Sequence, residues 1–337
     1  MGPWVPPRLM VITSAVGVVV GGSVLLKDFI VGHAQKLDGK IRADGKIVIV
    51  TGANTGIGKE TVKEMAKRGA TVYMACRDIA RCQEARKEIV LESLNKKVYC
   101  RECDLADFNS IRHFVSEFTL VEDRCDILIN NGGLMRSPRL STKQGIEMQL
   151  GVNHMGHFLL THLLLPSLQK AAPSRIVNVS SLAHTRGRIN FEDLNSEKEY
   201  DPGAAYNQSK LANVLFTKEL AKRLQGTGVT TNALHPGIVK TEIGRHMGLE
   251  SSIMASIFVK PLLSFFLKSP EQGALTTLFV ALDPSLEKVS GKYFSDCRET
   301  KVAPAGEDAA VARRLWVTSE RWTGIQENAS LEAAAPC

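Results

Sequence analysis

Tyr206 and Lys210 lie four residues apart in the segment Ala204 to Lys210, which we expect to be helical. Positions i and i+4 share one face of a helix, so the ammonium can lie beside the phenol and favour its ionised form. A phenol ordinarily titrates near pH ~10. Each unit by which its pKa falls lowers the free-energy cost of ionising it at neutral pH by about 1.4 kcal/mol. The pair is therefore a candidate proton donor and acceptor. The alternative is an exposed, solvated helix face.

A glycine-rich turn far upstream indicates what this proton donor works with. The segment Lys46 to Val50 is typical of a buried strand, and it runs directly into Thr51-Gly-Ala-Asn-Thr-Gly-Ile-Gly58. A helical pattern follows from Lys59 to Arg68. Strand, glycine turn and helix in this order form a dinucleotide site, because glycines let the backbone approach a pyrophosphate at the helix N-terminus. The spacing is Gly-x-x-x-Gly-x-Gly rather than Gly-x-Gly-x-x-Gly. The expected cofactor contacts in the turn are Gly52, Asn54, Thr55, Gly56, Ile57 and Gly58.

The next predicted strand, Ala70 to Ala75, should end beside the adenosine ribose of the cofactor. Enzymes that use NAD usually carry an acidic residue there, whereas this strand is followed by Cys76 and Arg77. Arg77 and Lys59 can both make charge-assisted hydrogen bonds to a 2′-phosphate. The sequence therefore predicts a preference for NADP(H). The alternative is that Arg77 stacks on adenine and Lys59 is solvated.

Five further motifs accompany the glycine turn and the Tyr206–Lys210 pair. They are Asp104 after a strand, Asn130-Asn-Gly-Gly133, Asn153, Ser181 and Pro236-Gly237. Over positions 44–300 the chain resembles the short-chain dehydrogenases/reductases, and within them the retinol dehydrogenase 11 to 14 group. The stretches Gly151 to Phe158 and Ser180 to His184 support the narrower resemblance. Gly132 departs from the usual Asn-Asn-Ala-Gly, and we expect the missing methyl to loosen that strand end slightly.

The resemblance implies a role for each of these side chains. Tyr206 is expected to be the general acid and base, with Lys210 as its electrostatic partner and a ribose ligand. Ser181, preferred over Ser180 for its spacing from the tyrosine, is expected to hold the substrate oxygen. Asn153 is expected to support a water-linked proton relay. The further cofactor contacts implied are Asp104 at the adenine, Asn131 and Gly133 along the cofactor, Pro236 and Gly237, and Thr241 at the nicotinamide carboxamide.

The same side chains make chemical sense without the resemblance. Hydride transfer to or from a carbinol carbon requires a proton to move at the oxygen, which a phenol beside a cation can provide. A serine hydroxyl can bond that oxygen as its charge develops. The resemblance implies retinoids or other lipophilic aldehydes as substrates, NADP(H) as cofactor, and reduction as the favoured direction. Steroid or fatty-aldehyde substrates are one alternative, and a non-catalytic NADP(H)-binding scaffold is another.

Length and patterning predict the fold that positions these residues. The chain has 337 residues, of which 44% are hydrophobic and 23% charged. Further short apolar strands are expected at 98–103, 125–130, 175–180 and 230–235, with helices between them. This alternation predicts a Rossmann-type, doubly wound parallel sheet with helices on both faces. We divide the chain into an N-terminal anchor and linker at 1–43, the Rossmann domain at 44–300, and a C-terminal helix (307–322) and tail at 301–337. A homo-oligomer is possible.

Two apolar segments point to a membrane. Residues 9–26 carry no charge and lie between Arg8 and Lys27, near the shortest length that spans a core about 30 Å thick. We expect an uncleaved anchor, with a cleaved signal peptide as the alternative. The excess of basic residues after this segment predicts a cytosolic catalytic domain, on the endoplasmic reticulum or alternatively a mitochondrial membrane. Residues 253–267 are expected to be a lid over the substrate pocket that dips into the bilayer, or else a core helix.

Charge, cysteines and histidines exclude other classes. The net charge of +7 is spread along the chain without a nucleic-acid motif, so we expect attraction to anionic lipid headgroups and no nucleic-acid partner. Seven cysteines form no disulfide framework, which favours a reducing compartment, and Cys100-x-x-Cys103 lies on a strand rather than at a helix start. His154, His157 and His162 lack a carboxylate to complete a metal site, so we expect them to serve in packing.

Overall fold

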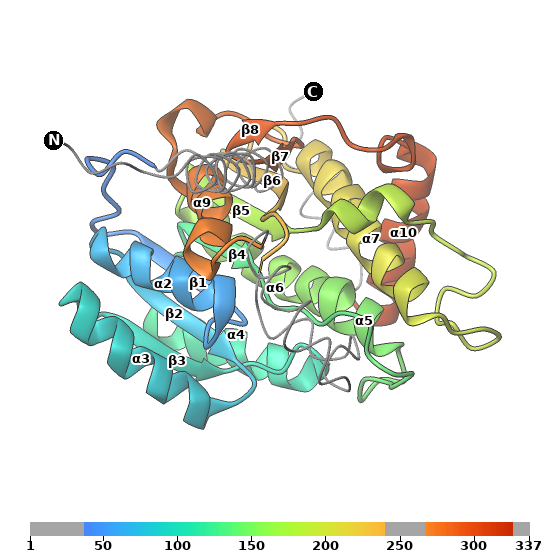
Figure 1. The fold of residues 1–337 in the computed structure, drawn as a ribbon, viewed down its shortest axis with the longest axis horizontal. Coiled ribbons are helices and arrows are strands. Elements are labelled where there is room, and N and C mark those ends of the chain that lie inside the picture. The colour runs from blue at the N-terminus through green and yellow to red at the C-terminus, as the bar shows by residue number, and fades with distance from the viewer. Residues whose placement is uncertain (1–36, 240–266, 326–337) are drawn as a thin grey trace, which may run out of the picture.

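The computed structural model describes residues 37–239 and 267–325, which form an α/β unit around one sheet (Figure 1). Within these ranges the sheet has eight strands in the order β3-β2-β1-β4-β5-β6-β7-β8. The strands are β1 (Ile47–Thr51), β2 (Thr71–Cys76), β3 (Val98–Glu102), β4 (Ile127–Asn130), β5 (Ser174–Val179), β6 (Val229–His235), β7 (Tyr293–Ser295) and β8 (Arg298–Glu299). Neighbours run parallel except β7 and β8. The predicted Rossmann-type fold is confirmed, with β7 and the antiparallel β8 as unpredicted additions.

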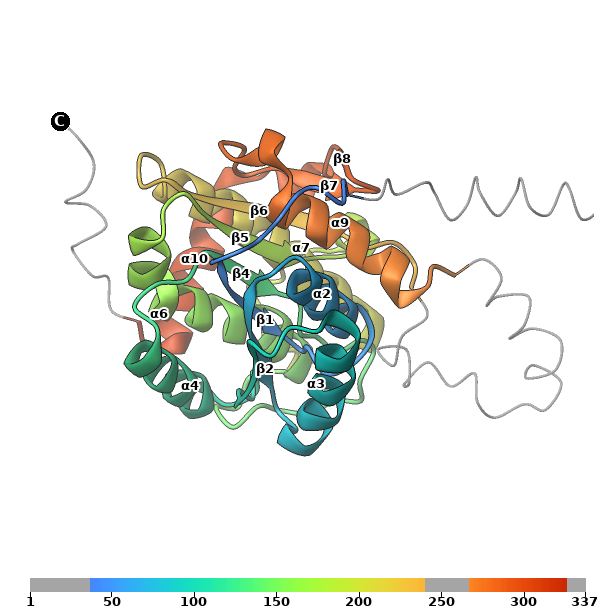
Figure 2. The same ribbon diagram turned by 90° about the vertical axis from the view of Figure 1, so that its left-hand side faces the viewer.

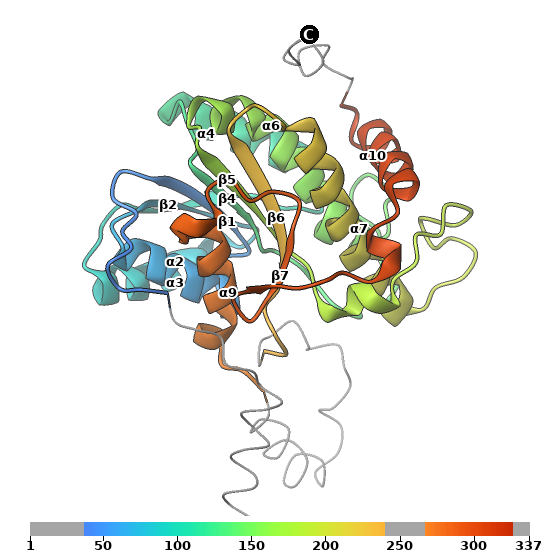
Figure 3. The same cartoon turned by 90° about the horizontal axis from the view of Figure 1, so that it is seen from above.

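Helices cover both faces of the sheet, as Figures 2 and 3 show. One face carries α2 (Gly56–Lys67), α3 (Ile79–Ser93) and α9 (Pro270–Leu282). The other carries α4 (Phe108–Val121), α6 (Gly156–Lys170), α7 (Pro202–Arg223) and α10 (Ala309–Thr323). Short elements join them, namely α5 (Met148–Leu150), the π-helix η1 (Gly151–Met155) and the 3-10 helices η2 (Leu182–Arg186), η5 (Pro284–Leu286) and η6 (Pro304–Gly306).

Strand β1 is buried along its whole length because both of its faces are covered. Side chains alternate across a strand, so Ile47 and Ile49 join the apolar core under α4, α6 and α7. Val48 and Val50 join the core under α2, α3 and α9. This two-sided burial explains the uninterrupted apolar run in the sequence. It also fixes the end of β1, where the glycine turn begins.

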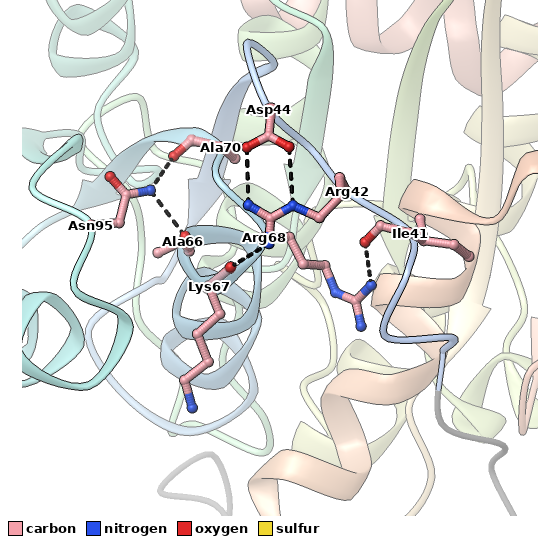
Figure 4. Close-up of polar contacts among 8 residues, drawn as sticks. All are labelled: Ile41, Arg42, Asp44, Ala66, Lys67, Arg68, Ala70 and Asn95. Carbon is pink, nitrogen blue, oxygen red and sulfur yellow. Dashed lines mark hydrogen bonds and ion pairs between the residues drawn. The ribbon is translucent and has the colours of Figure 1, made fainter.

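The described residues before β1 are fastened to the C-terminal end of α2 (Figure 4). Arg42 donates to the last carbonyl of that helix at 3.2 Å, and Arg68 donates to the carbonyl of Ile41. Asn95 donates to two carbonyls that flank the helix end, at 3.0 and 2.9 Å. Arg42 thus bonds a carbonyl that the helix end leaves free, while Arg68 and Asn95 tie the residues on either side of that end to it. Residues 37–43, assigned to the linker from sequence, therefore pack against the domain.

Helix α7, which carries the expected catalytic pair, is enclosed between the sheet and α10. It begins with Asp201, whose carboxylate accepts from the backbone N–H of Ala204 at 2.6 Å, and with Pro202 in the first turn. The helix predicted at 307–322 is α10. Its Trp316 is 2% exposed and packs edge-on against Phe158 of α6. The inner face of α10 therefore completes the core over α6 and α7.

The cysteine prediction was wrong at one pair, since Cys82 of α3 and Cys100 of β3 form a disulfide with their Cα atoms 6.0 Å apart. The two residues meet because α3 packs back onto β3, which a spacing in sequence does not reveal. Cys76, Cys103 and Cys125 are buried thiols.

Within residues 37–239 and 267–325, no helix is long and apolar enough to cross a bilayer. The expected anchor at 9–26 lies outside the described residues. So does nearly all of the expected lid at 253–267.

Candidate active site

The glycine turn between β1 and α2 has the backbone that a bound pyrophosphate requires. Gly52 and Gly56 adopt φ angles of +60° and +55°, a region that favours glycine. A Cβ on Gly58 would lie 2.2 Å from the carbonyl oxygen of Gly52, so this position has room for hydrogen only. Thr55 begins α2 without a side-chain cap, and no acidic residue occupies the first turn. The helix N-terminus is thus left available to an anion, and the turn fits a dinucleotide.

Thr51 and Asn131 hold this turn against the end of β4. The Thr51 hydroxyl accepts from the backbone N–H groups of Asn131 and Gly132 at 2.9 and 2.8 Å. The Asn131 amide donates to the Thr51 carbonyl at 2.9 Å. Strand order reverses between β1 and β4, where ligands bind in open α/β sheets. The expected cofactor residues therefore lie at the topological switch point.

The methyl that Gly132 lacks would have no free space beside it. A Cβ at this position would lie 2.8 Å from Cδ1 of Leu105. The leucine side chain, 7% exposed, already fills the space of the missing methyl. Packing from a neighbouring segment therefore compensates for the departure from Asn-Asn-Ala-Gly.

The expected catalytic residues converge between α7 and the end of β5. Tyr206 and Lys210 are 8% and 3% exposed, and the lysine Nζ lies 5.8 Å from the centroid of the tyrosine ring. Lys210 donates to the carbonyl of Val179, the last residue of β5, at 3.1 Å. Ser181 follows two residues later, and its hydroxyl lies close enough to the Tyr206 phenol to lower the pKa of that group. Phenol, ammonium and serine hydroxyl therefore meet in one place.

The structure also separates Ser181 from its neighbour. The Ser180 hydroxyl is buried and donates to the backbone carbonyl of Lys210 at 2.7 Å, which ties the end of β5 to α7. Among the residues that the structure describes, the Ser181 hydroxyl accepts from the N–H of Ala183 at 3.2 Å and otherwise acts on Tyr206. Ser180 is thus a structural tie. The role of Ser181 at the substrate oxygen stays a prediction.

Asn153 lies in the π-helix η1, and both the oxygen and the nitrogen of its side-chain amide form hydrogen bonds. Its oxygen accepts from the N–H of Leu134 at 2.9 Å, and its nitrogen donates to Ser209 of α7 at 2.9 Å. A Cβ on Gly133 would lie 3.0 Å from the Asn153 amide oxygen and 3.7 Å from Nζ of Lys210. Asn153 therefore joins the site through Gly133. Its role in a water-linked relay stays a prediction.

Burial dominates the electrostatics of the catalytic pair. It lowers the pKa of Lys210 to about 8. It also raises the pKa of Tyr206 above its ordinary value, opposed by the hydrogen bond with Ser181. The expectation that the ammonium makes the phenol more acidic is not met here. The desolvation of the phenolate raises the pKa more than the neighbouring groups lower it.

The histidines after Asn153 serve in packing, as expected. Burial lowers the pKa of His154 to about 3 and those of His157 and His162 to about 4, so all three are neutral. His157 contacts the Thr51 hydroxyl at 2.8 Å, which ties α6 to the glycine turn. Among the described residues, no cluster of histidine, cysteine, aspartate or glutamate could hold a metal ion.

The two basic residues expected at the adenosine end are placed differently. Arg77 follows β2, is exposed, and forms no hydrogen bond or ion pair with the residues that the structure describes. The Lys59 ammonium instead pairs with Glu88 of α3. Asp104 is half-buried after β3, and its carboxylate accepts from the N–H of Ala106 at 2.9 Å. Arg77 is thus free to bind an anion, whereas Lys59 must leave Glu88 to do so.

At the opposite end of the site, Pro236 and Gly237 follow β6. Gly237 has a φ angle of +91°, and a Cβ there would lie 2.6 Å from the side chain of Lys268. Lys268 is buried and pairs with Asp296. This expected nicotinamide end therefore rests on a partly buried ion pair. Thr241 lies outside the described residues.

The structure adds three residues that the sequence reasoning did not single out. Thr51 stands immediately before the turn and was not assigned a role. His184 belongs to the stretch Ser180 to His184 that supported the family resemblance, but it was given no role. Its hydrogen bond to the Ser181 carbonyl forms only because η2 folds the chain back. Tyr293 comes from the short strand β7, and its hydroxyl is buried without a partner among the described residues. No local pattern marks β7, because three residues are too few to show a period.

Comparison with known proteins identifies the family. The family model described as short chain dehydrogenase matches residues 46–251. The chain belongs to the short-chain dehydrogenase family. It is therefore an oxidoreductase that uses a nicotinamide cofactor, and the resemblance to the retinol dehydrogenase 11 to 14 group is confirmed.

Two curated relatives are similar over nearly their whole length. Retinol dehydrogenase 13 of Mus musculus is 52% identical, over 94% of this chain and 95% of that protein. Retinol dehydrogenase 13 of Homo sapiens is 51% identical, over 98% and 99%.

Solved structures share the fold. An uncharacterized protein from Mycobacterium Paratuberculosis is 35% identical with a TM-score of 0.69, over 86% of this chain and 98% of that one. A 3-ketoacyl-(acyl-carrier-protein) reductase from Brucella melitensis, complexed with NADH, has a TM-score of 0.58 at 24% identity, over 74% and 96%.

The substitution Gly58→Ala tests the fit of the turn to the cofactor. The added methyl must displace the Gly52 carbonyl, so we expect the affinity for NADPH to fall at least about tenfold, or about 1.4 kcal/mol. Fluorescence titration with NADPH measures this. Gly39→Ala is the matched control, because nothing lies within 4 Å of a Cβ there. Wild-type affinity in a folded Gly58→Ala variant would contradict this account of the turn.

Proposed function

We propose that this protein is an NADP(H)-dependent oxidoreductase that interconverts retinol and retinal or related lipophilic alcohols and aldehydes, with carbonyl reduction favoured. The observation that carries the proposal is the meeting of Tyr206, Lys210 and Ser181 beside the end of β5. The retinoid class is supported by relatives named retinol dehydrogenase that are about half identical to this chain. Steroid or fatty-aldehyde substrates remain the alternative within this chemistry.

Each side chain has a distinct task in carbonyl reduction. When bound, the nicotinamide cofactor supplies the hydride. Ser181 donates a hydrogen bond to the carbonyl oxygen and stabilises the charge that develops on it. Tyr206 delivers its phenolic proton to the same oxygen. Lys210 then stabilises the phenolate that remains, and its bond to the Val179 carbonyl keeps the ammonium in place.

The protonation state of Tyr206 suits the first step of carbonyl reduction. Reduction begins from the protonated phenol, whereas alcohol oxidation begins from the phenolate. Because burial raises the pKa of Tyr206, the phenol is protonated at neutral pH. The resting side chain is therefore in the state that reduction consumes.

The substitution Tyr206→Phe separates an enzyme from a scaffold that only binds the cofactor. Without the phenolic proton, we expect kcat for retinal reduction with NADPH to fall about 10²- to 10⁴-fold while NADPH still binds. Tyr99→Phe, on a half-exposed ring of β3, is the matched control and should keep wild-type kinetics. A Tyr206→Phe variant with undiminished turnover would reject this mechanism. A wild-type protein that binds NADPH but reduces no lipophilic aldehyde would favour the scaffold.

The preference for NADP(H) is supported by the charges after β2. Arg77 is exposed and without a partner among the described residues, so it can meet a 2′-phosphate. The nearest carboxylate in sequence, Asp78, instead caps α3 by accepting from the N–H of Arg81 at 3.0 Å. That carboxylate is thus engaged in the helix and not offered to a ribose hydroxyl.

Arg77→Gln tests this preference. Loss of a charge-assisted bond to the 2′-phosphate should raise KM for NADPH about tenfold and leave KM for NADH unchanged. Steady-state kinetics with both cofactors measure the change. Lys87→Gln removes the same charge from the exposed side of α3 and should change neither constant. A wild-type protein that prefers NADH would rule the assignment out.

The cellular placement is also a proposal. We infer that residues 9–26 anchor the protein in the endoplasmic reticulum, or alternatively a mitochondrial membrane, with the catalytic domain in the cytosol. The support is the uncharged length of that segment and the net charge of +7, which suits anionic lipid headgroups. Release of the full chain from membranes by alkaline carbonate would count against the anchor.

A further inference from the structure

His184 is bonded directly to the backbone of the catalytic serine. It lies in η2, three residues after Ser181, and is 1% exposed. Its Nδ1 lies 2.7 Å from the Ser181 carbonyl oxygen, which also accepts from the His184 backbone N–H at 3.1 Å. On the other side of the ring, Nε2 lies 3.4 Å from the backbone nitrogen of Ala303. The imidazole therefore bridges the serine and the segment that leads into η6.

The partners of His184 fix its protonation state. A carbonyl oxygen accepts only, so Nδ1 carries the proton and donates it to Ser181. The N–H of Ala303 donates only, so Nε2 carries a lone pair. Burial lowers the pKa of His184, in agreement with a neutral ring. A single neutral tautomer thus satisfies both bonds.

Tyr293 holds the imidazole from the side. Its ring lies 4.7 Å from that of His184, and it packs in a cluster with Val214 of α7 and Ala233 of β6. Val214 lies one helical turn after Lys210. The same α7 surface that carries the catalytic pair therefore braces the ring that presses on His184.

Without the imidazole, the Ser181 carbonyl loses the shorter of its two hydrogen bonds. The Ser181 carbonyl would keep only the backbone bond of one 3-10 turn, which is weaker than an α-helical turn. The serine hydroxyl must bond Tyr206 and, under the function proposed above, the substrate oxygen. A shift of this backbone moves the hydroxyl away from both.

We propose that His184 is a positioning residue for Ser181, whose Nδ1–H holds the serine carbonyl and so directs its hydroxyl to the reacting oxygen. This role rests on the proposed reduction of lipophilic carbonyls. It assigns His184 no proton transfer, because both ring nitrogens are engaged by the backbone. The effect of losing it should fall on the chemical step rather than on cofactor binding.

Two substitutions at this position separate the two bonds. In His184→Asn the amide nitrogen takes the place of Nδ1 and keeps the bond to Ser181. In His184→Gln the longer side chain places an amide oxygen near Nε2, which keeps the bond to Ala303 but loses the one to Ser181. We expect His184→Gln to lower kcat for retinal reduction about 10- to 100-fold, with KM for NADPH unchanged, since misplacement by about 1 Å has this effect. His184→Asn should stay within about threefold of wild type.

A slower chemical step has its own signature. With NADPH deuterated at the transferred position, the isotope effect on kcat should be larger in His184→Gln than in wild type, because hydride transfer limits turnover more fully. A merely structural histidine would not produce this change. His162 supplies the control. Its Nδ1 also meets a carbonyl, that of Phe158 at 3.3 Å, but on α6 away from the serine. His162→Asn and His162→Gln should both keep the wild-type kcat and isotope effect.

The outcomes are distinguishable. An active wild type with an equally active His184→Gln variant would overturn the positioning role alone. Equal losses of kcat in both His184 variants, in step with a lowered melting temperature, would also overturn it and indicate a structural histidine. A wild type that reduces no lipophilic carbonyl would overturn the proposed function together with this role.

Discussion

The burial of one ammonium group next to a phenol is the constraint on which the rest of this structure depends. Lys210 is 3% exposed, and within the described residues its Nζ meets a backbone carbonyl and no carboxylate. A buried cation without a counter-ion is costly, and its pKa of about 8 expresses that cost. A carboxylate partner would remove the strain and also neutralise the charge that a phenolate needs. The site therefore keeps the ammonium reactive at the expense of stability.

The surrounding architecture holds this unfavourable group in position. Ser180 ties the end of β5 to the Lys210 backbone, and Asn153 ties the π-helix to Ser209, the residue before Lys210 on α7. Thr51 and Asn131 join the glycine turn to β4 in the same way. The glycine turn and the Tyr206–Lys210 pair thus both lie at the carboxyl ends of the parallel strands. Hydrogen bonds to backbone, which cannot change rotamer, set most of these positions.

Features encoded by local pattern were predicted from the sequence, and features created by tertiary contact were not. The strands β1 to β6 and the glycine turn follow from apolar runs and glycine spacing, so their existence was foreseen. β7 and β8 have three and two residues, too few to show a period. The disulfide between Cys82 and Cys100 depends on how α3 returns to β3. It therefore leaves no trace in the spacing of cysteines.

The candidate site shows the same division. The Tyr206–Lys210 pairing follows from helical geometry and was predicted, whereas the raised pKa of Tyr206 depends on burial, which comes from packing by other elements. The engagement of Lys59 by Glu88 joins two helices and was likewise missed. His184 acquires its role only when a 3-10 turn folds it back onto Ser181.

The central claim is that Tyr206 and Ser181 act on the same substrate oxygen, and a double-mutant cycle tests it most directly. The measurement is kcat/KM for retinal reduction by NADPH in wild type, Tyr206→Phe, Ser181→Ala and the double variant. Groups that act as a unit give strongly non-additive losses, so the double variant should be little slower than Tyr206→Phe alone. Losses that multiply in full would mean that the two hydroxyls act independently, and would contradict the account.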